Sequence, residues 1–182
     1  MNLPNKLTLG RIIAVPFFIA LYMTGYYWPA LIIFILASLT DMLDGKIARK
    51  YNLVTNFGKI MDPLADKILV YSAFCLMVGD GLIPAWVLII ILAREFLIAG
   101  MRTVAASEGI VIAADMSGKI KTVLQMVAVP LLILYRAVQA MDSSSYVTYV
   151  QYAALGFLYA SLVMTVYSGS EYVIKNKTVF RQ

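Results

Sequence analysis

Four aspartates between residues 41 and 66 are the side chains best placed to do chemistry. Asp41 and Asp44 are three residues apart, and Asp62 and Asp66 are four apart, so on helices each pair projects from one face. Two helices joined by a short loop could aim all four carboxylates at one point. At an effective dielectric of about 20, two like charges roughly 4 Å apart repel by about 4 kcal/mol. Such a group is therefore protonated or binds cations, and a divalent metal is the expected partner.

The composition of the chain limits the choice of metal. The chain has no histidine and one cysteine, Cys75, so a typical zinc site of nitrogen and sulfur ligands cannot be assembled. Sites built only of oxygen suit Mg²⁺, Mn²⁺ or Ca²⁺. A pair of hard cations held by shared carboxylates is a usual device for phosphoryl transfer. The pattern therefore favours an enzyme that acts on phosphate groups.

Small residues and one arginine accompany the aspartates. Gly45, Ala48 and Gly58 would let a bulky ligand approach the helix backbones. The simpler alternative is that they pack membrane helices against each other. The guanidinium of Arg49 suits a diphosphate.

Together these residues match the spacing DxxDGxxAR(x8)GxxxDxxxD at every position. In this the chain resembles the CDP-alcohol phosphotransferase family, whose members transfer a phosphatidyl or similar group from a CDP-linked donor to an acceptor hydroxyl and release CMP. The resemblance implies two divalent cations, Mg²⁺ or Mn²⁺, that bind the CDP diphosphate and are held by Asp41, Asp44, Asp62 and Asp66. It further implies that Asp66 is the general base, that Gly45, Ala48 and Gly58 line the cytidine pocket, that Arg49 contacts the diphosphate, and that the protein is a homodimer.

The composition predicts an all-α membrane protein. Of 182 residues, 62% are hydrophobic, which is too many for an ordinary soluble domain. We expect one domain over residues 1–182. Since a span needs about 20 predominantly apolar residues, we expect six helices, the first with its apolar part at 12–23. The others are expected at 28–50, 58–78, 84–106, 119–139 and 146–173.

The distribution of basic residues predicts the orientation in the cell membrane. The segments GYYWP, GDGLIP and MDSSS contain no Lys or Arg, and of the fifteen basic residues only Arg136 lies near them. Because cytoplasmic loops carry the excess of Lys and Arg, both termini and the aspartates are expected on the cytoplasmic side. The basic residues form no long hydrophilic face or tail, so nucleic acid is not an expected partner.

The start of the chain offers further polar side chains. We expect Asn5, Thr8 and Arg11 to lie along the cytoplasmic surface. Asn5 and Thr8 are candidates for CDP binding. Thr8 and Arg11 share a helix face and could contact a phosphate. The alternative for Arg11 is an interfacial anchor whose charge reaches into the headgroups.

Charged residues in the later helices predict an acceptor site. Arg94, Glu95 and Arg102 interrupt an apolar helix, and such groups must face the interior of the bundle or a wet cavity. Glu95 either pairs with one of these arginines or has a role of its own. Lys119 and Lys121 point apart on the next helix, and we predict that Lys119 enters the cavity while Lys121 reaches to the membrane surface. The predicted acceptor-phosphate residues are Arg94, Arg102, Lys119 and Arg11.

These clusters match an acceptor that carries a phosphate. Together with the opening NLPNKLTLGR and the segment AREFLIAGMR, the resemblance implies a reaction that makes phosphatidylglycerol phosphate and CMP from CDP-diacylglycerol and sn-glycerol 3-phosphate, in phospholipid biosynthesis. Two alternatives stay open. One is another acceptor in the same family, inositol phosphate or another polar alcohol. The other is a divalent-metal transporter, which should carry acidic residues across the whole bilayer, whereas only Asp80 and Asp142 lie near the outer face.

Overall fold

The computed structural model describes residues 3–50, 56–110, 112–113, 115–141 and 144–177. Within these helices, the side chains at 3–4, 42–50, 56–57, 59–60, 62–63 and 144–145 lie outside the described part. The described residues form six α-helices and no strand. The helices are α1 Leu3–Met23, α2 Tyr27–Lys50, α3 Asn56–Gly79, α4 Ala85–Ser107, α5 Met116–Gln139 and α6 Ser144–Lys175.

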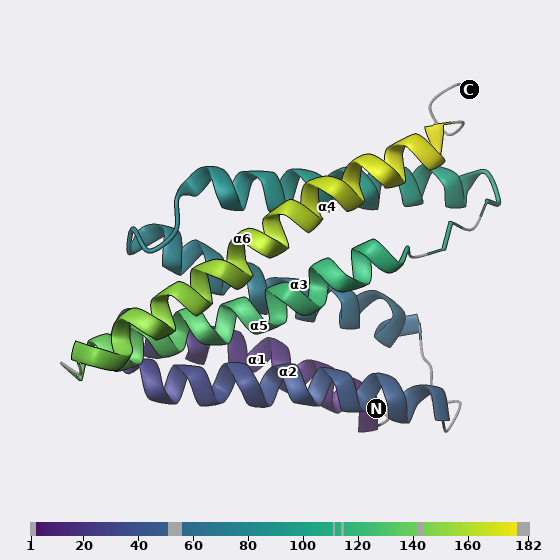
Figure 1. The fold of residues 1–182 in the computed structure, drawn as a ribbon. Coiled ribbons are helices and arrows are strands. Elements are labelled where there is room, and N and C mark those ends of the chain that lie inside the picture. Colours follow the sequence, from purple (N-terminus) through teal and green to yellow (C-terminus); the bar gives the residue numbers. More distant parts are fainter. Residues whose placement is uncertain (1–2, 51–55, 111, 114, 142–143, 178–182) are drawn as a thin grey trace.

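The helices run alternately in opposite directions (Figure 1). One end of the molecule, here called the terminal end, holds the start of α1, the end of α6 and the connections from α2 to α3 and from α4 to α5. The other end, the far end, holds the remaining three turns. At two of these turns Gly25 and Gly81 adopt φ angles of 81° and 68°, which other residues rarely adopt.

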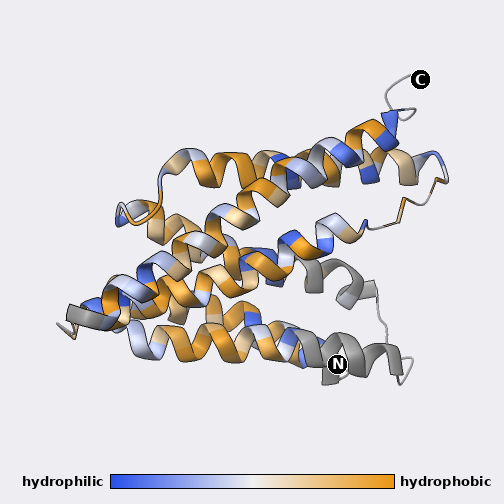
Figure 2. Cartoon of the chain, viewed as in Figure 1, coloured by the Kyte–Doolittle hydropathy of each residue, from blue (hydrophilic) through white to orange (hydrophobic). Residues whose placement is uncertain are grey.

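The apolar character of the helices extends to their outer faces (Figure 2). Phe17, Ile89 and Val163 are each more than half exposed, as expected of side chains that face lipid rather than water. Three helices are long and apolar enough to cross a membrane, Asn5–Met23, Met116–Gln139 and Tyr146–Lys175. The prediction of an all-helical membrane protein is therefore confirmed for the described part of the chain.

Helix α1 is longer than its apolar run. Its buried face begins with Asn5, Thr8 and Arg11 and continues through Val15 and Phe18, at the spacing of three and four that marks one side of a helix. The alternative in which Arg11 is an interfacial anchor is wrong, because its side chain is buried and paired with Asp41. The polar groups of all three residues are inside the bundle, where buried polar groups need partners.

Helix packing leaves α4 partly separate. α5 packs along α6, and α1 packs against α2 and α3, while α4 packs mainly on α6. The far end is tied together by Asp80, whose carboxylate accepts a 2.9 Å hydrogen bond from the Tyr22 hydroxyl and lies 3.3 Å from Nε of Arg136. Towards the terminal end, α4 diverges from α5 and a cleft opens between them.

Candidate active site

The sequence-predicted aspartates stand on α2 and α3, at the terminal end. Asp41 and Asp66 are partly buried, and their carboxylates are close enough for their charges to repel each other. The guanidinium of Arg11, buried on α1, donates to the carboxylate of Asp41. Arg11, Lys67 and Lys121 lie close enough to attract the charge of Asp66. Helices α1, α2, α3 and α5 therefore bring acidic and basic groups to one region.

Of the remaining signature residues, the structure describes Gly58, which is buried in α3. Five others have side chains outside the described part. They are Asp44, Gly45, Ala48 and Arg49 on α2 and Asp62 on α3.

The described donors suit a hard divalent cation. Asp41 and Asp66 contribute carboxylate oxygens from two helices, and their mutual repulsion is what a shared cation relieves. Within the described side chains no three potential ligands gather at one point, and the other two aspartates of the signature lie outside that set.

A basic cleft of about 900 Å³ lies between α4, the start of α5 and the end of α6. Its charged lining comprises Arg94, Arg102, Lys119, Lys67, Glu95 and Asp115. Three of the four residues predicted to bind the acceptor phosphate thus line one cleft. The fourth, Arg11, is not part of its lining.

The two arginines of α4 are held by α6. Arg94 donates to Ser168 Oγ at 3.0 Å and to a carboxylate oxygen of Glu95 at 2.9 Å. Arg102 donates from Nε to the Tyr172 hydroxyl at 3.1 Å, with its guanidinium 5.5 Å from the ring centre. Hydrogen bonds of this kind fix the direction of a guanidinium, so both cations are presented to the cleft in defined orientations.

Two glycines make room for Arg94. A Cβ added at Gly118 on α5 would lie 3.1 Å from a terminal nitrogen of Arg94, and one at Gly169 on α6 would lie 3.0 Å from its Cγ. These distances are shorter than ordinary van der Waals contact. The side chain of Arg94 therefore passes between two helix surfaces that only glycine leaves open.

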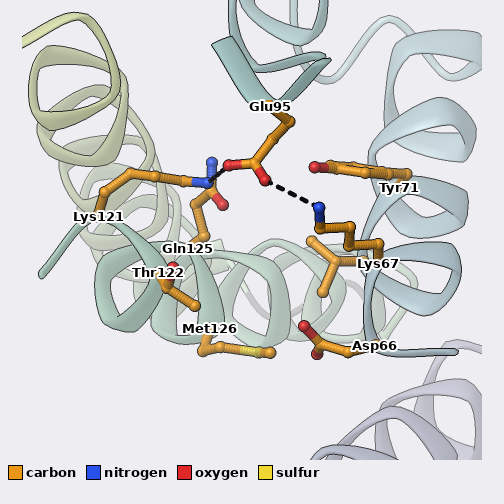
Figure 3. A pocket seen from close by; sticks show the side chains of 9 residues that line it. Asp66, Lys67, Tyr71, Glu95, Lys121, Thr122, Gln125 and Met126 are labelled. Carbon is orange, nitrogen blue, oxygen red and sulfur yellow. Dashed lines mark hydrogen bonds and ion pairs between the residues drawn. The ribbon is translucent and has the colours of Figure 1, made fainter. Parts of the chain in front are cut away.

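A second cavity, of about 80 Å³, adjoins the cleft (Figure 3). It is lined by Asp66, Lys67, Val70, Tyr71, Glu95, Lys121, Thr122, Gln125 and Met126. Glu95, Lys67 and Thr122 also line the large cleft. The wall between the predicted base and the basic cleft therefore consists of these side chains.

The prediction for Lys121 is wrong. Lys121 is buried, with 3% of its surface exposed, and its ammonium group donates to Glu95, whereas Lys119 is exposed and lines the cleft. The interpretation in which Glu95 pairs with Arg94 is confirmed. A buried ammonium group is tolerated only beside a counter-charge, and α4 supplies one.

Five residues of this region were not predicted from the sequence. Lys67, Gly118, Ser168, Gly169 and Tyr172 all contact or line the cleft. A signal exists for two of them, since Ser168 and Tyr172 are four apart and share the face of α6 that meets α4. Their arginine partners are about seventy residues away in the chain, so no local sequence pattern could predict which side chains pair.

The comparisons with known proteins agree with this class of membrane protein. The model of the CDP-alcohol phosphatidyltransferase family matches residues 1–168, and the chain belongs to that family of enzymes. A Bacillus subtilis relative, named CDP-diacylglycerol–glycerol-3-phosphate 3-phosphatidyltransferase, is 43% identical over 96% of this chain and 95% of its own. A Rickettsia typhi protein of the same name is 37% identical over 98% and 99%. A Mycobacterium tuberculosis relative, named probable phosphatidylglycerophosphate synthase, is 37% identical over 96% and 81%.

Proposed function

We propose that the protein transfers the phosphatidyl group of CDP-diacylglycerol to sn-glycerol 3-phosphate, giving phosphatidylglycerol phosphate and CMP. The observation that carries the proposal is the cleft in which Arg94, Arg102 and Lys119 stand next to the cavity of Asp66. An acceptor with a phosphate at one end and a hydroxyl at the other needs this combination of cations and base. The names of the relatives support the same pair of substrates.

The reaction assigns a role to each group. The primary hydroxyl oxygen of the acceptor attacks the phosphorus that carries diacylglycerol, and the bond from that phosphorus to the oxygen of CMP breaks. The hydroxyl proton passes to Asp66, which must lie within about 3 Å of the hydroxyl, directly or through one water. Arg94, Arg102 and Lys119 bind the acceptor phosphate. Arg11, buried against Asp41, orients that carboxylate instead.

The donor site is proposed at the signature. Asp41, Asp44, Asp62 and Asp66 would hold two divalent cations, Mg²⁺ or Mn²⁺, which neutralise charge on the diphosphate when bound. Gly45, Ala48 and Gly58 would line the cytidine pocket, Arg49 would contact the diphosphate, and Asn5 and Thr8 would complete the site from α1. The fit rests on the carboxylates of Asp41 on α2 and Asp66 on α3, whose like charges repel each other.

The setting of the site follows from the charge pattern. We propose six spans, a single domain over residues 1–182, both termini in the cytoplasm and the site at the cytoplasmic face of the cell membrane. The helix ends at the terminal end carry Arg102, Lys119 and Lys175, and the far end carries Asp80 beside Arg136. The positive-inside rule favours this arrangement. A homodimer is proposed from the family alone.

A panel of labelled acceptors tests the substrate. The purified protein, with CDP-diacylglycerol and Mg²⁺ or Mn²⁺, should release CMP with sn-glycerol 3-phosphate and give little with glycerol, serine or inositol phosphate. Faster release with inositol phosphate or a neutral alcohol would assign a different acceptor. A metal transporter would release no CMP and would move Mn²⁺ into sealed vesicles.

Replacing the proposed base gives the first site prediction. Asp66→Asn should lower kcat by about a hundredfold or more, within the usual range for general bases, while the protein stays folded in detergent. Asp80→Asn, in the turn between α3 and α4 at the far end of the molecule, is the matched acidic control and should keep its activity. Unchanged CMP release by Asp66→Asn would remove the base assignment.

A further inference from the structure

Glu95 on α4 gathers three cations from three helices. Its carboxylate accepts from the ammonium group of Lys121 on α5 and, at 2.9 Å, from the guanidinium of Arg94 beside it on α4. The second oxygen lies 3.5 Å from the ammonium group of Lys67 on α3. The side chain of Glu95 is 12% exposed. Figure 3 shows the carboxylate between Lys121 and Lys67, with the hydroxyl of Tyr71 also turned toward it.

Two of these cations have a second carboxylate within reach of their charge. Lys67 is the next residue after Asp66, and both Lys67 and Lys121 attract the charge of Asp66. Asp66 and Glu95 stand on opposite walls of the same small cavity. The two carboxylates therefore compete for the same ammonium groups, and in the structure Glu95 holds both of them.

The competition bears on the chemistry. An ammonium group bonded to Asp66 would occupy the oxygen that must accept a proton, and it would compete with a cation for the same carboxylate. We propose that Glu95 is a positioning residue that keeps Lys67 and Lys121 away from Asp66, and that it directs Arg94 into the basic cleft. The inference rests on the proposed function, because it takes Asp66 as the base.

A purely structural role for Glu95 predicts something different. A buried carboxylate that only balances buried cations affects stability, and its loss leaves Lys121 without its bonded counter-charge. In that case activity falls only as far as folding does. The positioning role predicts instead a loss of kcat and of metal binding in folded protein, both largely reversed when the buried ammonium group of Lys121, which bonds Glu95 directly, is also removed.

The test uses the full chain in detergent and two variants. Glu95→Gln keeps the shape of the side chain and removes its charge, and Glu95→Gln/Lys121→Gln also removes the buried ammonium group. Glu171→Gln is the matched control, since Glu171 on α6 bonds Lys175 and Ser117 at the surface, away from Asp66. Three quantities are measured for each protein. They are kcat with sn-glycerol 3-phosphate, binding of Mn²⁺ alone by electron paramagnetic resonance, and the Tm.

We expect Glu95→Gln to lower kcat by about tenfold or more and to weaken Mn²⁺ binding, since about 1.4 kcal/mol corresponds to a factor of ten. The double variant should recover kcat to within about fivefold of the parent and should restore Mn²⁺ binding. The control should match the parent in both measurements.

Three results would overturn the inference. They are a Glu95→Gln protein with parental kcat and Mn²⁺ binding, a double variant no better than the single one although its Tm is restored, and an equal loss in the Glu171→Gln control. Should Glu95→Gln fail to fold, the double variant decides alone, because the inference requires it to bind Mn²⁺ as the parent does. Failure of the proposed function is distinguishable, since the parent protein itself would then release no CMP with sn-glycerol 3-phosphate while the Mn²⁺ comparison could still be made.

Discussion

At the scale of single residues, the chemistry of this protein depends on how charges are divided among a few buried groups. Arg94 shows this division most clearly. One of its terminal nitrogens bonds Glu95 and the other bonds Ser168, so the planar guanidinium is fixed at both ends. Lysine carries the same charge but cannot make two divergent bonds from a rigid plane. Geometry, and not charge alone, is what Arg94 contributes to the cleft.

Arg94→Lys should therefore weaken acceptor binding without removing positive charge. We expect the KM for sn-glycerol 3-phosphate to rise by about tenfold, as for the loss of one charged hydrogen bond worth about 1.5 kcal/mol. The KM for CDP-diacylglycerol should stay unchanged, because the proposed donor site lies on α1, α2 and α3. Steady-state kinetics with each substrate varied in turn measures both values. Arg136→Lys, at the far end, is the control. A rise in the KM for CDP-diacylglycerol instead would show that Arg94 binds the donor and not the acceptor.

At the scale of elements, α6 forms the wall against which α4 presents its arginines. Ser168 and Tyr172 bond Arg94 and Arg102 from one face of α6, and Gly169 leaves the space through which Arg94 passes. This close approach fixes the distance between the two helices at the cleft.

Gly169→Ala should disturb this wall. The added Cβ would lie 3.0 Å from Cγ of Arg94, so Arg94 must shift and its bonds to Glu95 and Ser168 weaken. We expect kcat/KM for the acceptor to fall by about fivefold to thirtyfold, equivalent to about 1 to 2 kcal/mol. Gly156→Ala on the same helix is the matched control, since nothing lies within 4 Å of its added Cβ. Equal effects of the two substitutions would show that the loss comes from α6 as a whole.

The helices themselves were largely predictable from the sequence, because long apolar runs separated by turn-forming residues determine where they lie. The expected segment 84–106 became Ala85–Ser107, and 119–139 became Met116–Gln139. Helix α1 was an exception. Asn5, Thr8 and Arg11 lower the hydropathy of its first turns, although they continue the buried face of the helix. Hydropathy alone cannot distinguish a polar surface from a polar interior.

The candidate site was predictable in its residue types but not in all its pairings. The sequence correctly placed Lys119 and Lys121 on different faces of one helix. Which of the two faces inward depends on Glu95, which approaches from α4 and accepts from Lys121. That contact joins residues 26 positions apart, and no local pattern reports it.

At the scale of the whole molecule, the two ends differ in charge and in how they are held. Among the described residues of the far end, the charge of Asp80 is paired with Arg136, and its carboxylate also accepts from Tyr22. At the terminal end the basic residues exceed the acidic ones and open onto the cleft. The positive-inside rule predicts that such a molecule inserts with its basic end inside, where nucleotides and soluble phosphates occur.

Single cysteines test that orientation. In a Cys75→Ser background, Thr24→Cys places a thiol in the far-end turn and Ser107→Cys places one at the terminal end of α4, and both positions are exposed. In spheroplasts of an expressing bacterium, a membrane-impermeant maleimide should label Thr24→Cys at once and Ser107→Cys only after permeabilisation. The reverse pattern would place the basic cleft outside the cell, away from its proposed substrates, and would contradict the positive-inside assignment. Because the two thiols sit at opposite ends of one bundle, the same experiment also shows whether the chain adopts one orientation or both.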